Sequence, residues 1–330
     1  MPVYNGASGL EAALRSVLDQ AFVDFEAVVV DDGSTDETPQ VLRRFQKSDA
    51  RIRPLLRPHQ GIAAALNAGL QAARGSLIAR MDDDDVCAPE RFAEQVAWLA
   101  EHPDLGLVGS LVEFGGDREL HRGYALYVDW LNSLVEPAEI ALNRFVESPF
   151  AHPSVVFRRS LVDRFGGYRE GDFPEDYELW LRWLDGGVRM GKCRRPLLRW
   201  NDPPTRLSRT DARYRPRAFF RCKAEYLARW LRTHNPRHPE VAIWGAGRET
   251  RKRIEPLAEF GVRIQAYVEI DPKKIGQVVH GRPVLDGRQA LDPEQHFVVA
   301  CVGSRGARED IRRRLRQAGF REGRHFVCAA

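Results

Sequence analysis

The sequence predicts an α/β protein built on a mixed, mostly parallel sheet with helices on both faces. An apolar strand-like run, a polar turn and a helix-like segment recur before residue 105, and the same order returns after residue 239. Strands that alternate with helices are typical of parallel sheets covered on both sides. The 330 residues exceed the usual length of one small core, which predicts about two domains. We expect a first domain at residues 1–212, a basic helical linker at 213–238 and a small second α/β domain at 239–330.

The N-terminal segments predict the first repeats of this pattern. A short strand in MPVYN is followed by a helix, for which Ser8 as N-cap and Glu11 three residues later form a capping pattern. The apolar run AVVVDD predicts a second strand, and Ser34 and Glu37 mark the entry into the helix that follows it. RIRPLLR and SLIARM predict two further strands, separated by the Ala-rich helix GIAAALNAGLQAARG.

Beyond residue 105 the alternation loosens, but strand and helix signals remain. LGLVGSLVEF, HPSVVFRR and VRMGKCRRPLLRW predict strands, and FPEDYELWLRWLDGG predicts a short helix closed by two glycines. Within that helix Tyr177, Trp180 and Leu184 share a face that we expect in the core, whereas Trp183 lies off the face and could contact an acceptor.

Composition and charge limit the classes of function. A net charge of +4 does not require nucleic acid as a partner, and we expect none. The five cysteines are scattered without metal-ligand spacing, which favours reduced thiols in a cytoplasmic protein. Neither a long apolar span nor a signal sequence is expected. Arginines and aromatic residues interleave in the predicted linker, so contact with anionic lipid at the inner face of the membrane is an alternative to a solvated connecting helix, which we prefer.

The run Asp82 to Asp85 is the most unusual feature, because like charges directly after an apolar strand repel one another. Asp31 and Asp32 follow another predicted strand. Ligands of such sheets bind beyond the carboxyl ends of the strands, so the two acidic turns are expected to share one crevice. Oxygen ligands suit Mg²⁺ or Mn²⁺ bridging to a phosphate. The alternative is a solvated acidic turn.

Five motifs in order resemble the family 2 glycosyltransferases, which have the GT-A fold. They are MPVYNG, VVVDDGSTD, GIAAALNAGL, GSLIARMDDDD with PERF, and FPEDYELWLR, and the resemblance covers about residues 1–210. It implies an inverting transfer from a nucleotide-diphosphate sugar to the hydroxyl of a carbohydrate or lipid-linked acceptor, assisted by Mg²⁺ or Mn²⁺. UDP is the nucleotide that the resemblance favours, with GDP and dTDP as alternatives.

The resemblance also assigns roles to residues. Asp32 would accept a hydrogen bond from the base, Asp82 or Asp83 would meet the ribose, and Asp84 would hold the metal. Asp176 would be the general base, with Glu175 as its rival, and the start of a helix is expected to keep its carboxylate ionised at neutral pH. Acidic residues at a helix start are also common without any catalytic role. The expected donor-binding residues are Pro2, Val3, Tyr4, Asp32, Asp82 and Asp83.

Two features depart from the family pattern. The first strand is expected to be unusually short, because only three residues precede the YNG turn. Many relatives carry a metal-reaching histidine after the helix of the base, and this chain has none there. Arg199, Asp202 or Arg206 could take its place. His152 is expected in a loop or at a strand edge.

The second domain resembles a Rossmann-like nucleotide-binding domain. Gly245 and Gly247 form a Gly-x-Gly turn after a strand, with Thr250 where the third glycine of a dinucleotide fingerprint would stand, and Glu269 follows the next strand. A single Gly-x-Gly is a weak signal, so we favour a structural or regulatory role over a bound cofactor. Rival functions for the whole chain are a nucleotidyltransferase, an oxidoreductase acting through this domain and a non-catalytic nucleotide-binding protein.

Overall fold

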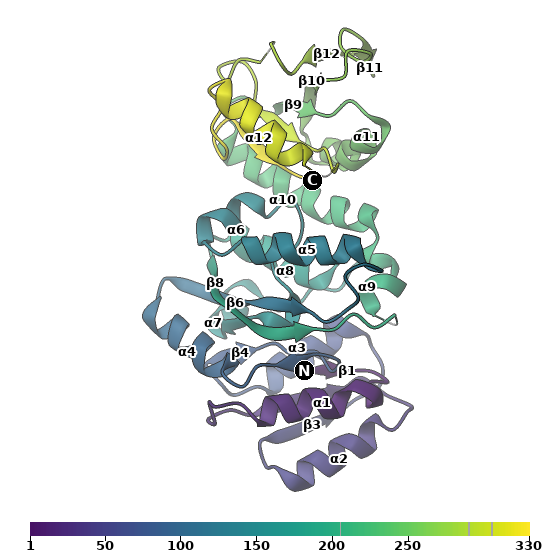
Figure 1. Ribbon diagram of the computed structural model, residues 1–330, viewed down its shortest axis with the longest axis vertical. Helices are drawn as coiled ribbons and strands as arrows, with labels where there is room; N and C mark the ends of the chain where they lie inside the picture. Colours follow the sequence, from purple (N-terminus) through teal and green to yellow (C-terminus); the bar gives the residue numbers. More distant parts are fainter. Residues whose placement is uncertain (205, 290, 305) are drawn as a thin grey trace. The chain divides into compact units, whose positions relative to one another are not determined.

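The computed structural model describes residues 1–204, 206–289, 291–304 and 306–330, and it has the expected α/β class (Figure 1). The chain divides into two compact units, each described here by itself. The first unit comprises Met1–Ala141, Pro149–Gly171 and Glu175–Asp211. The second comprises Leu142–Ser148, Asp172–Pro174 and Ala212–Ala330.

The first unit begins with a parallel three-stranded sheet in the order β1-β2-β3. Both connections step in the same direction across the sheet, so right-handed crossovers place their two helices on one face. Leu10, Leu14 and Leu42 from these helices pack there against Val29. The elements are β1 (Pro2–Val3), α1 (Ala7–Leu18), β2 (Ala27–Asp31), α2 (Thr38–Ser48) and β3 (Ile52–Leu56).

Both predicted N-caps are wrong by a few residues. Helix α1 begins at Ala7, so Ser8 lies inside it and Gly6 precedes it. Helix α2 begins at Thr38, whose backbone N–H donates to Asp36 Oδ1 at 2.9 Å. Ser34 instead accepts the N–H of Asn5 at 2.8 Å, because the turn after β2 folds against the turn after β1.

The second sheet of this unit is mixed, with the order β4-β7-β6-β8-β5. Strands β6 and β8 are parallel, and the three other pairings are antiparallel. The mostly parallel arrangement expected from the sequence therefore describes the first sheet better than this one. The strands are β4 (Leu77–Ala79), β5 (Val86–Cys87), β6 (Leu105–Phe114), β7 (Val156–Arg158) and β8 (Arg189–Trp200).

Helix α8 (Glu175–Asp185) carries the largest buried side chains of the first unit. Trp180 and Trp183 are both 0% exposed, and Trp183 packs edge-on to Phe157 with ring centroids 5.1 Å apart. The expectation that Trp183 could contact an acceptor is therefore wrong. The other helical elements around this sheet are α3 (Ile62–Ala72), α4 (Arg91–Glu101), α5 (Arg122–Ser133), α6 (Pro137–Asn143), η1 (His152–Ser154), α7 (Ser160–Phe165) and α9 (Leu207–Thr210).

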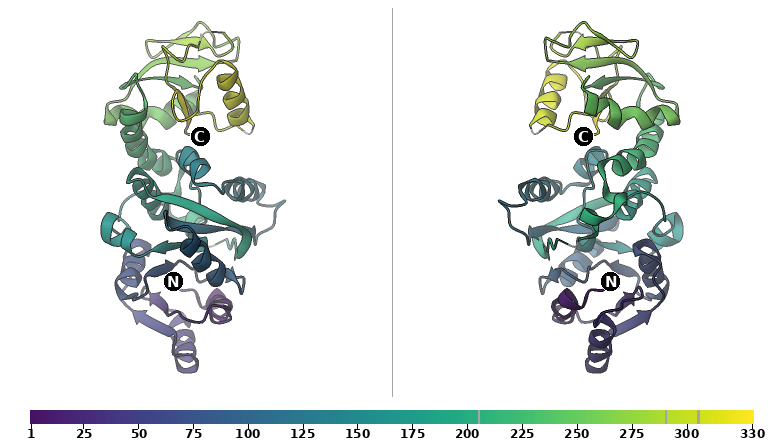
Figure 2. Two further views of the ribbon diagram at one scale, coloured as in Figure 1. Left: turned by 90° about the vertical axis from the view of Figure 1, so that its left-hand side faces the viewer. Right: turned by 90° about the vertical axis from the view of Figure 1, so that its right-hand side faces the viewer.

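The second unit contains a six-stranded sheet in the order β11-β12-β10-β9-β13-β14, parallel except for the β11-β12 hairpin. The steps from β9 to β10 and from β13 to β14 run in opposite directions, so right-handed crossovers put their helices on opposite faces. In Figure 2 the yellow helix α12 lies on one face of this sheet and the green helices lie on the other. The strands are β9 (Glu240–Trp244), β10 (Arg263–Glu269), β11 (Val278–Val279), β12 (Arg282–Asp286), β13 (Val298–Ala300) and β14 (Phe326–Cys328).

Helix α10 (Pro216–His234), which the sequence suggested as a linker, packs within the second unit. Tyr226 and Trp230 are buried, so two of the aromatic side chains that a lipid-binding face would use are withdrawn from the surface. Across the described residues, no helix combines the length and apolar character needed to cross a membrane. The remaining helical elements of this unit are η2 (Ala212–Tyr214), α11 (Arg248–Ile254), η3 (Glu255–Phe260) and α12 (Ala307–Gln317).

Candidate active site

Two rings form a platform at the carboxyl ends of β1 and β3. Tyr4, directly after β1, is 49% exposed, and its ring stacks on that of His59 with centroids 4.2 Å apart. Pro2 and Val3 are buried in β1, so Tyr4 is the member of this predicted trio that reaches the surface. His59 was not predicted from the sequence, although it follows an apolar strand as Asp32 does.

Asp32 is buried beneath this platform and is already surrounded by donors. Its carboxylate accepts the backbone N–H of Gly61 at 2.7 Å and that of Gln60 at 3.2 Å. His59 Nδ1 lies 2.9 Å away, and Arg57 Nε lies 3.4 Å away. These contacts give Asp32 a clear task within the protein, which is to hold the loop that presents His59.

The four aspartates after β4 have four different environments. Asp82 forms an ion pair with the buried Arg80. Asp83 packs on Gly6 so closely that a Cβ there would lie 1.8 Å from its Oδ2. Asp85 is 1% exposed, accepts the Asn201 backbone N–H at 2.8 Å through Oδ1, and leaves Oδ2 without a partner in the described part of the chain. Asp82, Asp83 and Asp84 all keep partial exposure, and Asp84 is the one that neither pairs with Arg80 nor packs on Gly6, so it is the member we expect to meet a ligand.

The pKa values of this run reflect a shortage of positive charge. Burial, followed by the charge of Asp84, raises the pKa of Asp83 to about 7. Burial, followed by the charge of Asp82, raises the pKa of Asp84 to about 6. Burial also raises the pKa of Asp85 well above its ordinary value. Carboxyls in this condition gain from any added cation.

The segment after β8 covers the aspartates and supplies one arginine. Asn201 Nδ2 donates to the Asp84 backbone oxygen at 2.6 Å. The guanidinium of Arg206 lies over the rings of Trp200 and Tyr124, 4.2 and 4.9 Å from their centroids, and its charge acts on Asp84 and Asp85. Of the three residues proposed to replace the missing histidine, Arg206 therefore approaches the aspartates.

The other two residues proposed for that place have different surroundings. The carboxylate of Asp202 is bound by Arg209 and lies 3.0 Å from His121 Nδ1. Arg199 is exposed on β8, opposite Val86 of β5.

Glu175 and Asp176 begin helix α8. Glu175 is 4% exposed, whereas Asp176 keeps partial exposure and accepts the Tyr177 N–H at 2.7 Å. Burial by its neighbours, followed by the charge of Glu175, raises the pKa of Asp176 to about 8. The expectation that the helix start keeps Asp176 ionised at neutral pH is wrong, because burial and Glu175 outweigh the helix dipole.

Two contacts and one electrostatic effect connect the turns after β1, β2 and β4 with the start of α8 in the first unit. Asn5 Oδ1 accepts the Thr35 N–H at 2.8 Å, which ties the turn after β1 to the turn after β2. The next residue, Gly6, lies against Asp83. The charge of Asp82 in turn raises the pKa of Asp176. The ends of β1, β2 and β4 and the start of α8 therefore face a common region.

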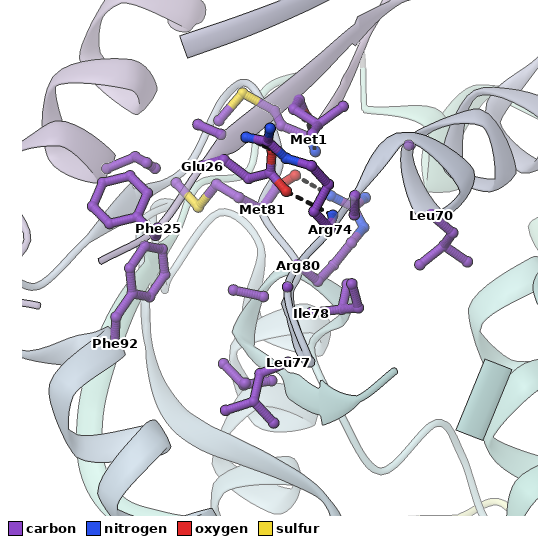
Figure 3. Close-up of a pocket in the computed structure, with 18 of the residues that line it drawn as sticks. Met1, Phe25, Glu26, Leu70, Arg74, Leu77, Ile78, Arg80, Met81 and Phe92 are labelled. Atoms are coloured by element: carbon purple, nitrogen blue, oxygen red, sulfur yellow. Dashed lines mark hydrogen bonds and ion pairs between the residues drawn. The ribbon is translucent and has the colours of Figure 1, made fainter. Parts of the chain in front are cut away.

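A cavity of about 620 Å³ lies elsewhere in the first unit, between β2, α3 and β4 (Figure 3). Its walls are mostly apolar, with Leu70, Leu77 and Ile78 among them, and Glu26 pairs with Arg74 there. Its lining includes none of Tyr4, His59, Asp84 and Asp176, but it includes Pro2, Arg80 and Tyr168, so the cavity adjoins residues of the candidate active site.

The aspartates do not form a complete metal site by themselves. Among the described residues no group of three or more His, Cys, Asp or Glu side chains is arranged to hold a metal ion. Mg²⁺ and Mn²⁺ are often held by one or two carboxylates together with substrate phosphates. The partly exposed carboxylate of Asp84 and the Oδ2 of Asp85, unpartnered among the described residues, fit that kind of shared site better than a protein cage.

The Gly-x-Gly turn of the second unit is closed by its own contacts. Gly245 has φ +115°, and a Cβ there would lie 2.8 Å from Thr250 Oγ1, so this position requires glycine. Thr250 Oγ1 donates to the Cys301 oxygen at 3.2 Å. Glu269 binds Lys274 Nζ at 3.1 Å and the Ala246 N–H at 3.4 Å. A nucleotide site at Gly245, Gly247 and Glu269 stays a prediction.

An α/β unit with acidic groups at several strand ends is typical of proteins that bind nucleotides at a sheet edge. Residues 1–166 match the model of the family described as glycosyl transferase family 2, which is half of the chain. The chain therefore belongs to glycosyl transferase family 2.

Curated relatives and solved structures agree with this membership. The amylovoran biosynthesis glycosyltransferase AmsE of Erwinia amylovora is 34% identical over 54% of this chain and 65% of its own length. A UDP-Gal:alpha-D-GlcNAc-diphosphoundecaprenol beta-1,3-galactosyltransferase of Escherichia coli is 30% identical over 54% of this chain and 63% of its own length. The chain thus spans just under two thirds of these relatives. The structure of S. aureus TarS 1-349 in complex with UDP-GlcNAc matches with TM-score 0.51 and 19% identity over 78% of this chain and 69% of that one, which shows a shared fold.

Proposed function

We propose that the first unit is an inverting glycosyltransferase that moves a sugar from a nucleotide-diphosphate donor, UDP-sugar in the first instance, to an acceptor hydroxyl. The observation that supports this proposal is the packing of Gly6, next to Asn5, against Asp83, together with the effect of the neighbouring Asp82 on the pKa of Asp176. Family membership and the GT-A-type fold support the same assignment.

The nucleoside would bind at the Tyr4–His59 platform. Stacking on aromatic rings accepts any base, and a partly exposed Tyr4 offers a face for it. Asp32 would act mainly by holding the loop of His59, because its oxygens already accept the N–H groups of Gln60 and Gly61.

The diphosphate would lie at the aspartate run. Asp84 would hold Mg²⁺ or Mn²⁺, and the bound cation would supply Lewis-acid stabilisation of the departing diphosphate. Arg206 would add a positive charge that acts on Asp84, and the rings of Trp200 and Tyr124 pack against its guanidinium. Asp83, packed on Gly6, would meet the ribose, with Asp82 kept in place by Arg80.

Asp176 would take the proton from the acceptor hydroxyl. A base is most effective when its pKa lies near the working pH, and the pKa of Asp176 is raised to about 8. Inversion needs a single base on the face opposite the leaving group. A lipid-diphosphate-linked sugar is the acceptor class we propose, by analogy with the Escherichia coli relative.

Release of nucleoside diphosphate is the direct test. The purified protein would be incubated with Mn²⁺, lipid-diphosphate-linked GlcNAc and a panel of UDP-, GDP- and dTDP-sugars. We expect release of nucleoside diphosphate that depends on both donor and acceptor. NMR of the product should show an anomeric configuration opposite to that of the donor sugar. Absence of transfer with every donor, or a product that retains configuration, would contradict the proposal.

A further inference from the structure

Arg80 is a buried arginine that contacts three different groups. Its side chain forms an ion pair with Asp82, donates to the backbone oxygen of Met81, and donates through Nε to His152 Nε2 at 3.2 Å. Burial opposes its charge, but Asp82 and the other negative groups near it, Glu175 among them, outweigh burial and raise the pKa of the guanidinium. A residue that only balanced the aspartate run would not need a buried contact with His152.

His152 joins Arg80 to Tyr168. The histidine is 8% exposed, and its Nε2 lies 2.7 Å from the Tyr168 hydroxyl. An arginine can only donate, so Nε2 must accept, and the ring is neutral with its hydrogen on Nδ1. Burial, followed by the charge of Arg80, lowers the pKa of His152 well below its ordinary value, which agrees with a neutral ring. His152 lies in the short turn η1 just ahead of β7, which fits the expected loop or strand-edge position, and it is buried there.

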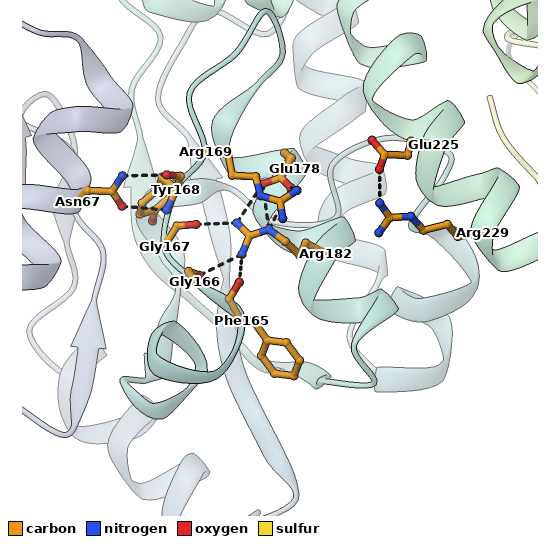
Figure 4. Close-up of polar contacts among 10 residues, drawn as sticks. All are labelled: Asn67, Phe165, Gly166, Gly167, Tyr168, Arg169, Glu178, Arg182, Glu225 and Arg229. Carbon is orange, nitrogen blue, oxygen red and sulfur yellow. Dashed lines mark hydrogen bonds and ion pairs between the residues drawn. The ribbon is translucent and has the colours of Figure 1, made fainter. Parts of the chain in front are cut away.

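Tyr168 is itself held from two sides (Figure 4). Asn67 of α3 donates to its backbone oxygen at 2.8 Å and accepts its N–H at 2.9 Å. Arg182 of α8 donates to the backbone oxygens of Gly166 and Gly167 at 3.0 and 2.6 Å, and Glu178 pairs with the same arginine. The loop that carries Tyr168 is therefore fixed to the helix that begins with Asp176.

We propose that Arg80, His152 and Tyr168 form a positioning network that joins the donor-side Asp82 to the general base Asp176. The catalytic role of this network rests on the proposed function. Its two tasks are to orient Asp82 for the donor and to keep a positive charge near Asp176. Burial and then Glu175 raise the pKa of Asp176, the Tyr177 N–H and the charge of Arg80 lower it, and Asp82 raises it. Burial is the main cause of the raised pKa of Tyr168 on the fixed loop, and the charge of Asp176 adds to it.

The two tasks can be separated by two substitutions at one position. Arg80→Lys keeps the charge but loses the planar fork, so we expect nucleoside diphosphate to bind about tenfold more weakly in calorimetry, with little change in the pKa of Asp176. Arg80→Gln loses both the charge and the planar fork. We therefore expect weaker binding of nucleoside diphosphate and also a further rise in the pKa of Asp176. Carbon-detected NMR of the Asp176 carboxyl in the ligand-free protein measures this pKa.

Controls keep the test decisive. Arg74→Gln removes an exposed arginine paired with Glu26 in the same unit and should change neither quantity. Tyr168→Phe keeps the ring and removes the hydroxyl, and should weaken binding in the same direction as Arg80→Lys if Arg80→Gln fails to fold. Variants that lower only the melting temperature, with binding and the pKa of Asp176 unchanged, would overturn the network. The pKa needs no turnover, so failure of transfer in the parent protein would count against the proposed function alone.

Discussion

Both units have acidic residues at the end of a strand, but the carboxylates are short of positive partners in the first unit and are paired in the second. In the first unit the run Asp82 to Asp85 is short of positive charge, and burial raises the pKa of Asp83 and Asp84 to about 7 and about 6. In the second unit Glu269 has Lys274 and a backbone N–H, and Thr250 closes on Cys301. One strand-end turn therefore gains from a ligand, whereas the other is satisfied without it.

The comparison teaches that the turn at the end of a strand marks a possible site, whereas the balance of polar contacts decides whether a ligand would stabilise that turn. A buried carboxyl oxygen without a partner, such as Oδ2 of Asp85, marks the first situation. Four predictions follow from the contrast, in order of expected size.

The largest effect is expected from Asp176→Asn. Removing a general base lowers rates by about 10²–10⁴-fold. The parent protein should gain activity as pH rises toward about 8, because the carboxyl must lose its proton to act as a base. The variant should lack this rise. A kcat/KM profile from pH 5.5 to 9.5 checks both, and an unchanged profile in the variant would remove Asp176 as the base.

Asp84→Asn should come next. Loss of a group that stabilises transition-state charge costs about 10²–10³-fold in rate. The variant should also lose any Mn²⁺-dependent rise in melting temperature with UDP present, since a ligand that binds only the folded state stabilises it. Asp104→Asn, at an exposed ion pair with Arg189, is the matched control and should behave like the parent. Equal activity of Asp84→Asn and the control would contradict the metal role.

His59→Ala tests the platform that the sequence did not reveal. Loss of base stacking costs about 1–3 kcal/mol, so donor KM should rise about fivefold or more with a smaller change in kcat. His59→Phe retains a ring and should recover part of the affinity. Steady-state kinetics over a range of UDP-sugar concentrations distinguishes the two variants. If both had the same donor KM, the nucleobase would not stack on the ring of residue 59.

The smallest effect on transfer is expected from Glu269→Gln in the satisfied turn of the second unit. Donor KM and kcat should stay within about twofold of the parent, because its partners Lys274 and the Ala246 N–H lie in the second unit. A large loss of transfer would show that the contrast between the two turns is mistaken. Equilibrium dialysis with UDP, GDP and NAD would at the same time test the predicted nucleotide site there.

The sequence predicted the elements and the general place of the site better than it predicted individual roles. The strand-helix alternation located β2, β3, α3 and α8, because apolar period and length are local properties. The helix starts at Ser8 and Ser34 failed, since the turn after β2 uses its polar groups against the turn after β1.

Roles that depend on distant residues could not be predicted. Four aspartates in a row look alike in sequence, and they differ because Arg80, Gly6 and Asn201 contact different members. The ionisation of Asp176 was misjudged because its helix position is local, whereas the burial and the charges that raise its pKa come from the folded chain. His59 and Tyr168 gain their significance from partners 16 or more positions away.

Gly6 limits which substitutions the start of the chain can accept. The smallest possible side chain, one methyl group, would overlap the carboxylate of Asp83 at 1.8 Å, so even alanine must push that aspartate or helix α1 aside. Saturation mutagenesis of the first ten residues should therefore find position 6 the least tolerant, ahead of the half-exposed tyrosine two places earlier. The absence of a Cβ atom at residue 6 therefore leaves the space that the carboxylate of Asp83 occupies.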